Sequence, residues 1–132
     1  MKTFEDLDVW QFCRKLRINL TKLAKQLPSD EKFRLTDQII RAARSVTNNL
    51  AEGYGRFHYQ ENIQFCRQSR GSVYELIDHL IVCLDDKYIT RDELDKYRSD
   101  CIRAIQLVNG YIRFLGSQKR KTEDGWEKSE NG

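Results

Sequence analysis

The chain has 132 residues, of which 33% are charged and 39% hydrophobic, and its formal net charge is +3. That length predicts a single domain, and the weak charge excludes a strongly basic, histone-like composition. No apolar run approaches the ~20 residues that a membrane span needs, so we expect no membrane binding. The polar, acidic opening Lys2–Asp6 predicts no signal peptide. We therefore expect a cytoplasmic protein.

Apolar residues recur at alternating steps of four and three along four segments, which predicts four amphipathic helices. The first runs from about Leu7 to Leu27 and the second from about Asp30 to Gly53 or Arg56. The third spans about Gln60 to Lys87, and the fourth begins after Thr90 and runs to about Leu115. One Pro and seven Gly in the whole chain agree with a helical protein.

The ends of the helices carry their own signals. Pro28 stops the first helix, and Ser29 or Asp30 can cap the second. Gly53-Tyr54-Gly55 suits a C-terminal cap of the second helix. The run Thr90-Arg91-Asp92-Glu93 has the form of a capping box that opens the fourth helix.

Short connections between these helices predict an all-α fold, an up-down-up-down antiparallel four-helix bundle over residues 1–118. Residues 119–132 are polar and lose the period, which predicts a disordered C-terminal tail. Apolar side chains outnumber what one slim core needs. This surplus indicates self-association into a homo-oligomer, although scattered exposed hydrophobics are also normal on monomers.

The residue types argue against an enzyme. Only two histidines occur, His58 and His79, and Glu75 precedes His79 by four residues where di-iron bundles use a spacing of three. No glycine-rich loop follows a strand. We therefore predict no catalytic residues, no metal and no cofactor. The four cysteines are scattered, so we interpret them as reduced, buried residues, with a disulfide as the less favoured alternative; they are Cys13, Cys66, Cys83 and Cys101.

The second helix is the most informative element. Within a stripe roughly 60° wide it carries amide, hydroxyl and charged groups instead of the Lys and Glu of a plain solvated face. The stripe consists of Gln38, Arg41, Ser45, Asn49, Glu52 and Arg56, with Asn48 beside it. This pattern indicates hydrogen bonding to a neighbouring helix or to a ligand.

Several of these segments resemble a known bacterial family of four-helix bundles. The resemblance rests on Phe4, Leu7, Val9 and Trp10, on Leu27-Pro28, on the run Gln38–Arg56 with its Asn-Leu-Ala-Glu-Gly centre, and on Arg70-Gly71-Ser72 with Glu75. The family comprises proteins encoded by intervening sequences within 23S ribosomal RNA genes, also labelled S23 ribosomal proteins. The resemblance covers about Phe4 to Leu115.

The resemblance implies a homopentamer of four-helix bundles, in a family whose biochemical role is not settled. A more distant resemblance is to the accessory variability determinant of diversity-generating retroelements, a basic pentamer that partners a reverse transcriptase and nucleic acid. One departure is visible, because the family often has Pro where this chain has Thr47. The kink that such a proline would produce is therefore not expected here.

Two functional hypotheses remain open, with RNA or DNA, or a protein, as candidate partners. In the first, a basic surface binds phosphates through Lys32, Arg34, Arg41, Arg44, Arg56 and Arg67, and Phe57-His58-Tyr59 stacks on an unpaired base or packs a loop. In the second, the chain is a scaffold without nucleic-acid binding. Its structural polar network then consists of Gln38, Ser45, Asn48, Asn49, Glu52, Arg70 and Glu75, with Arg70 paired to Glu52.

Overall fold

The computed structural model describes residues 2–131, and the side chains of residues 2–123. The regular elements of this part of the chain are all helices, and it contains no strand. Its elements in chain order are η1 (Phe4–Asp6), α1 (Asp8–Lys25), η2 (Ser29–Glu31), α2 (Leu35–Tyr54), α3 (Tyr59–Asp85) and α4 (Arg91–Asn131). The prediction of an all-α, four-helix fold is confirmed.

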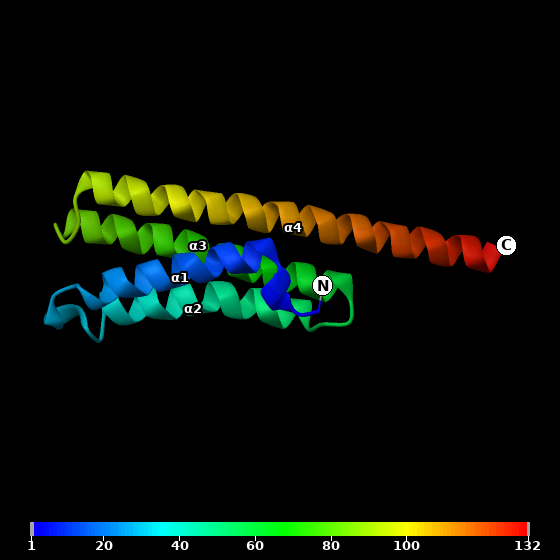
Figure 1. Ribbon diagram of the computed structural model, residues 1–132, viewed down its shortest axis with the longest axis horizontal. Helices are drawn as coiled ribbons and strands as arrows, with labels where there is room; N and C mark the ends of the chain where they lie inside the picture. The colour runs from blue at the N-terminus through cyan, green and yellow to red at the C-terminus, as the bar shows by residue number, and fades with distance from the viewer. Residues whose placement is uncertain (1, 132) are drawn as a thin grey trace.

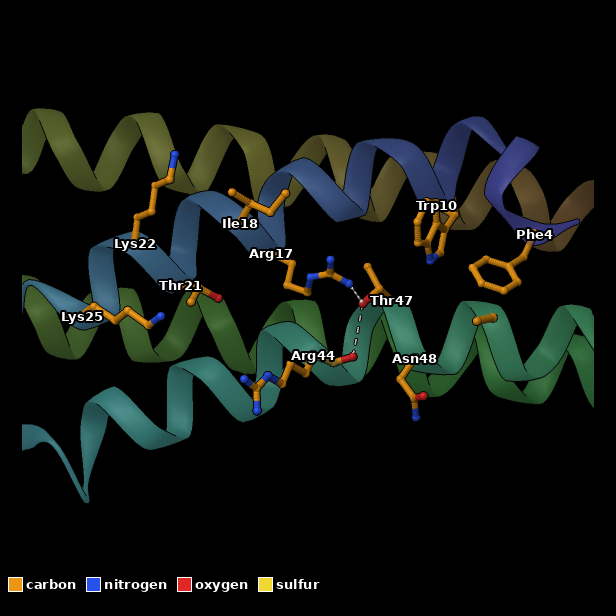
Figure 2. A pocket seen from close by; sticks show the side chains of 11 residues that line it. Phe4, Trp10, Arg17, Ile18, Thr21, Lys22, Lys25, Arg44, Thr47 and Asn48 are labelled. Atoms are coloured by element: carbon orange, nitrogen blue, oxygen red, sulfur yellow. Dashed lines mark hydrogen bonds between the residues drawn. The ribbon is translucent and has the colours of Figure 1, made fainter.

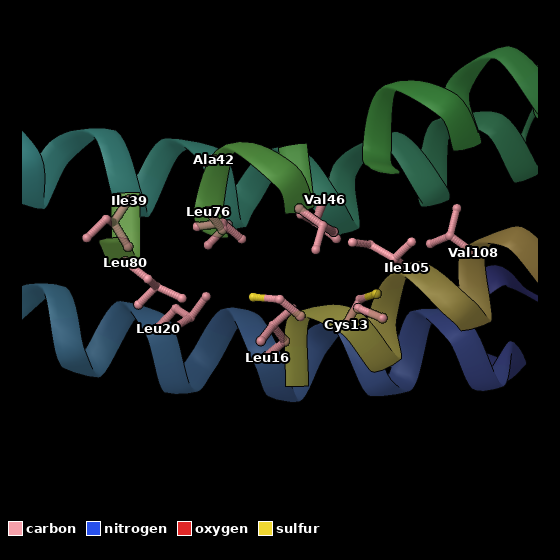
Figure 3. Close-up of a cluster of buried hydrophobic side chains, with 14 of the residues drawn as sticks. Cys13, Leu16, Leu20, Ile39, Ala42, Val46, Leu76, Leu80, Ile105 and Val108 are labelled. Atoms are coloured by element: carbon pink, nitrogen blue, oxygen red, sulfur yellow. The ribbon is translucent and has the colours of Figure 1, made fainter. Parts of the chain in front are cut away.

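The four helices pack around one core. Each helix packs against the next in sequence, and α1 also contacts α4. The turns that join α2 to α3 and α3 to α4 lie at opposite ends of α3, and α4 extends beyond the α2–α3 turn (Figure 1). All four helices contribute fully buried side chains to the core, among them Leu20, Ile39, Leu76 and Val108 (Figure 3).

The apolar periodicity of the sequence gives the buried faces correctly. On α1, the five seam residues Val9, Cys13, Leu16, Leu20 and Leu23 are at most 5% exposed. All four cysteines are buried as free thiols. Burial raises the pKa of Cys13, Cys66 and Cys101 to about 12 and that of Cys83 to about 11.

The second helix begins five residues later than the sequence predicts. Residues Ser29–Glu31 form the short 3-10 helix η2, and α2 starts at Leu35. The reason is Glu31, which is only 8% exposed and whose Oε2 accepts the Leu35 backbone N–H at 3.2 Å. Its Oε1 also accepts from Arg34 Nη2 at 2.8 Å and from Tyr88 Oη at 3.4 Å. A residue expected inside the helix therefore caps it and ties it to the α3–α4 turn.

The role predicted for Gly53 is also corrected. The chain ends α2 at Gly55, whose φ of −75° is available to any residue, so no left-handed glycine cap is needed. Gly53 itself is buried against α3. A Cβ placed there would lie 2.6 Å from Asn62 Oδ1 and 2.9 Å from Phe65 Cβ. Glycine is required at this point because α2 and α3 approach closely, and not because the helix terminates.

The fourth helix opens with the predicted capping box. The Glu93 backbone N–H donates to Thr90 Oγ1 at 3.2 Å, and the Thr90 backbone N–H donates to Glu93 Oε1 at 3.1 Å. From there α4 continues to Asn131, so its backbone is helical through most of the segment 119–132; the predicted domain boundary and disordered tail stay predictions. None of the described helices is long and apolar enough to cross a membrane.

Candidate functional site

A groove of about 700 Å³ runs between α1 and α2 (Figure 2). Four of its lining residues are basic, namely Arg17, Lys22 and Lys25 of α1 and Arg44 of α2. The other residues along the groove are apolar or uncharged: Phe4, Trp10, Ile18, Thr21, Thr47, Asn48 and Ala51. With four cations and no acidic group along it, the groove is positively charged.

Arg17 is held at the bottom of this groove. Its Nη1 donates to Thr47 Oγ1 at 3.0 Å, and the Thr47 hydroxyl lies 3.4 Å from the backbone carbonyl oxygen of Arg44, to which it donates (Figure 2). Thr47 is 3% exposed, so the anchor is rigid. The side chains of Lys22, Lys25 and Arg44 are exposed. Within residues 2–123, none of the four groove cations forms an ion pair.

Aromatic rings lie at one end of the groove. The capping box of Thr3 and Asp6 fixes η1 and with it Phe4. The Phe4 and Trp10 rings meet edge to face, with centroids 5.1 Å apart and an interplanar angle of 69°. The Arg14 guanidinium lies 5.8 Å from the centre of the Trp10 ring. The groove therefore combines cations that can neutralise phosphates with a ring that can contact a base.

Of the six predicted binding residues, only Arg44 lies in the groove. Arg34 and Arg41 are ion-paired, Arg34 with Glu31 at 2.8 Å and Arg41 Nε with Asp37 Oδ2 at 2.9 Å. The other three are exposed elsewhere: Lys32 Nζ is 5.4 Å from the Phe33 ring, Arg56 is 4.8 Å from the Phe65 ring, and Arg67 is on α3. The six residues do not all line the same groove.

Three cations of the groove are not among the predicted binding residues: Arg17, Lys22 and Lys25. The signal for them in the sequence is the charge of the first helix, which over Asp8–Lys25 carries five basic residues and a single acidic one. Its amphipathic pattern is otherwise ordinary, whereas the second helix has an unusual polar stripe.

The predicted polar network is divided between several places. Its centre exists, because Asn49 Nδ2 donates to Ser45 Oγ at 2.9 Å and Ser72 Oγ donates to Ser45 Oγ at 2.8 Å, which joins α2 to α3. Gln38 and Glu75 line a hollow of about 480 Å³ beside these hydroxyls, together with Arg41 and His79. Asn48 instead lines the groove, and Glu52 is exposed.

Arg70 has a different partner from the one predicted. Its Nη1 donates to Asn109 Oδ1 of α4 at 2.7 Å, so the partner is an amide and not the Glu52 carboxylate. Arg70 is half-buried, and solvent reaches part of its side chain. An amide oxygen is therefore a sufficient acceptor. The prediction of a carboxylate partner assumed that Arg70 is fully buried, which it is not.

Comparison with known proteins decides the family. A family model described as 23S rRNA-intervening sequence protein matches residues 5–110, a range that includes all of α1, α2 and α3. The chain belongs to this family. The resemblance seen in the sequence is thereby confirmed, and every residue of the groove except Phe4 falls within the matched range.

The fold of this chain is similar to that of a solved structure from the S23 ribosomal protein family. It is the crystal structure of a protein with unknown function from Bacteroides thetaiotaomicron. The TM-score is 0.74, with 21% sequence identity, over 80% of this chain and 95% of that chain. At that identity the likeness shows the fold alone. No curated protein matches the chain.

Proposed function

We propose that this protein is a non-catalytic accessory protein that binds RNA or DNA through the groove between α1 and α2. In this proposal the up-down-up-down antiparallel bundle assembles as a ring-like homo-oligomer, a pentamer by family resemblance. The observation that carries the proposal is a set of four cations, Arg17, Lys22, Lys25 and Arg44, that form no ion pair within residues 2–123 and line a groove with no acidic residue among its described lining side chains.

The geometry of the groove supports phosphate binding. Lysine and arginine side chains bind nucleic acid mainly by neutralising phosphates and releasing counterions. Arg17 is already ordered by Thr47, so it loses less conformational entropy when it binds a phosphate. Arg34 and Arg41 differ from the groove cations, because each of them already has a carboxylate partner.

Exposed apolar side chains support assembly. Tyr74 and Ile81 on α3 and Ile102 on α4 are 56%, 38% and 41% exposed. Burying such side chains against a second copy removes apolar surface from water, which stabilises an oligomer. Repetition of the groove around a ring would strengthen weak phosphate binding through multivalency.

The absence of catalysis is part of the proposal. No histidine, cysteine or carboxylate lines the groove among the side chains that the structure describes. The cysteines lie in the core, and burial raises their thiol pKa values to about 11–12, far from those of catalytic thiolates. A groove of this composition is suited to binding an anion and not to moving a proton.

A titration of the purified protein tests the proposal. Labelled structured RNA and duplex DNA are titrated at about 50 and 200 mM salt, with anisotropy as the readout. Four phosphate contacts predict a slope of log K against log salt of about −3.6 on duplex DNA, or roughly a 100-fold loss of affinity over this range. No binding at either salt would overturn the proposal.

Two matched variants locate the site. Arg44→Gln removes a groove cation, and Arg41→Gln removes the same charge three residues away on the same helix, where it is paired with Asp37. Arg44→Gln is expected to reduce the magnitude of the slope by about 0.9, and Arg41→Gln to leave it nearly unchanged. Equal effects of the two variants would show that net charge alone, and not the groove, attracts the nucleic acid.

A second candidate function is a protein scaffold without nucleic-acid binding. The observation that favours it is the same exposed apolar surface of Tyr74, Ile81 and Ile102. Light scattering measures the solution mass, and so it tests assembly independently of nucleic-acid binding in the groove. The pentamer predicts a mass about five times the 15.7 kDa of one chain, and Ile81→Asp is expected to reduce that mass. Full assembly without binding to any nucleic acid would favour the scaffold.

A further inference from the structure

A second hollow lies where the α2–α3 turn meets α4, and its walls are mainly aromatic. Its volume is about 290 Å³, which is at the lower end of the range for small-molecule sites. Six ring-bearing residues line it: Tyr54, Phe57, His58, Tyr59, Tyr111 and Phe114. This number of rings around a small space favours a flat, unsaturated ligand group.

Several of these rings are exposed to solvent and contribute little to the core. Phe57 is 94% exposed, and Phe114 is 53% exposed. The Tyr111 and Phe114 rings are stacked, with centroids 6.4 Å apart and an interplanar angle of 14°. The Phe57 and His58 rings meet edge to face at 5.0 Å. Open ring faces of this kind are stacking surfaces for nucleobases in proteins that bind single strands.

Hydrogen bonds of Asn62 support the wall of this hollow. Asn62, which is 6% exposed, donates from Nδ2 to the Tyr111 hydroxyl oxygen at 3.3 Å. Asn62 also accepts from Cys66 Sγ at 3.6 Å. The Tyr111 ring is therefore fixed from behind, while Phe57 stays free on the solvent side.

The charges around the hollow favour an anionic ligand over an apolar peptide. Arg56 lines it, and no acidic residue does among the described side chains. An adjoining hollow of about 490 Å³ shares Phe57 and His58 and is bordered by Lys119 and Glu123. Lys119 Nζ donates to Gln60 Oε1 at 3.1 Å and lies 3.9 Å from Glu123. A cation, Arg56, beside ring faces matches a nucleotide, which carries a base and a phosphate.

The hollow and the aromatic end of the groove are lined by residues close together in the sequence. Phe4 and Trp10 line the end of the groove, whereas Leu7, which lies between them in sequence, lines the hollow. Ala51 and Tyr54 of α2 are three residues apart, and they line the groove and the hollow respectively. A strand that follows the cations of the groove therefore reaches the aromatic rings next.

We propose that this aromatic hollow binds an unpaired nucleobase, stacked on Phe57, of the strand whose phosphates lie in the groove. The inference rests on the proposed function and narrows it, because it makes single-stranded or looped RNA or DNA the preferred ligand class. Stacking accepts any base, so the hollow adds affinity for unpaired bases without selecting a sequence.

Two phenylalanine variants test this site on the full-length protein. Phe57→Ala removes the exposed ring of the hollow, and Phe33→Ala removes a ring that is 85% exposed and precedes α2. Neither ring is part of the core, so both variants are expected to fold. The probes are a labelled single-stranded oligonucleotide and its duplex, and a single strand with one 2-aminopurine, whose fluorescence is quenched by stacking.

Phe57→Ala is expected to weaken single-strand binding about 5- to 100-fold and to abolish the quenching, while duplex binding stays unchanged. Phe33→Ala is expected to leave both affinities unchanged.

If Phe57→Ala binds the single strand as the wild type does, the inference is wrong. A loss of affinity in Arg44→Gln would then still support binding in the groove. If the wild type binds neither probe, both proposals fail. A changed solution mass of Phe57→Ala with unchanged binding would assign the rings to a contact between copies, which also overturns the inference.

Discussion

Replacing Gly53 with alanine tests the close approach of α2 and α3. At an ordinary position inside a helix, alanine is more favourable than glycine by about 1 kcal/mol. At Gly53 the added Cβ would lie 2.9 Å from Phe65 Cβ and 3.1 Å from the Asn62 backbone oxygen, besides 2.6 Å from Asn62 Oδ1. The first two neighbours are not the flexible ends of side chains. The two helices must therefore move apart.

The expected effect is a net destabilisation. Overpacking of a tight contact costs about 1–3 kcal/mol, and the helix propensity of alanine offsets about 1 kcal/mol of it. We expect Gly53→Ala to lower the free energy of unfolding by up to about 2 kcal/mol. For a chain of this length, that change lowers the thermal midpoint by up to about 10 °C.

Gly71→Ala is the matched control, since a Cβ there meets nothing within 4 Å. That variant is expected to gain up to about 1 kcal/mol of stability and a higher thermal midpoint. Both variants are measured by calorimetry at one protein concentration, because assembly makes the midpoint concentration-dependent. A Gly53→Ala protein as stable as Gly71→Ala would refute the packing argument.

Three further predictions follow from contacts in the described structure. Thr90→Ala removes the capping box of α4 and is expected to cost about 1 kcal/mol in a denaturant titration, with an unchanged stability arguing against the cap. A double-mutant cycle of Arg70→Ala with Asn109→Ala is expected to give a coupling energy of about 1 kcal/mol, whereas Arg70→Ala with Glu52→Ala is expected to give none. The four core thiols are expected to resist a thiol reagent at pH 8 until the protein unfolds. The unfolded thiols lose protons near their ordinary pKa of about 9.0, and the folded ones near 11–12. The contribution of the thiols to the free energy of unfolding is therefore expected to be level below about pH 8 and to fall above pH 9. A level profile up to pH 11 would contradict the burial of the thiols.

The sequence predicts the helices and the core well, because both depend on periodicity. A residue such as Leu20 is buried whichever helix lies opposite, so its stripe can be recognised without knowing the neighbour. The start of α2 was mispredicted for the converse reason. Glu31 leaves the helix to accept the Leu35 N–H and the Tyr88 hydroxyl, and Tyr88 is 57 residues away. Helix propensity contains no information about that partner.

The groove depends on contacts between helices and was only partly foreseen. Arg44 was predicted from its own helix, but Arg17 belongs to the site because α1 packs beside Thr47. Periodicity shows that both side chains lie away from the core and does not show which helix is adjacent. The same limit explains the wrong partner for Arg70, since nothing local indicates that Asn109 faces it.

The Glu31 carboxylate makes the two ends of the bundle unequal in their dynamics. It links the start of α2 to the α3–α4 turn, whereas the α2–α3 turn with exposed Phe57 lies at the other end of α3 (Figure 1). We therefore expect local opening to begin near the α2–α3 turn, beside the aromatic hollow, as is common for ligand-binding elements. Amide hydrogens near Leu35 are expected to exchange with solvent more slowly than those near Phe57. The rings that we assign to base stacking then lie where the fold can adjust without loss of its core.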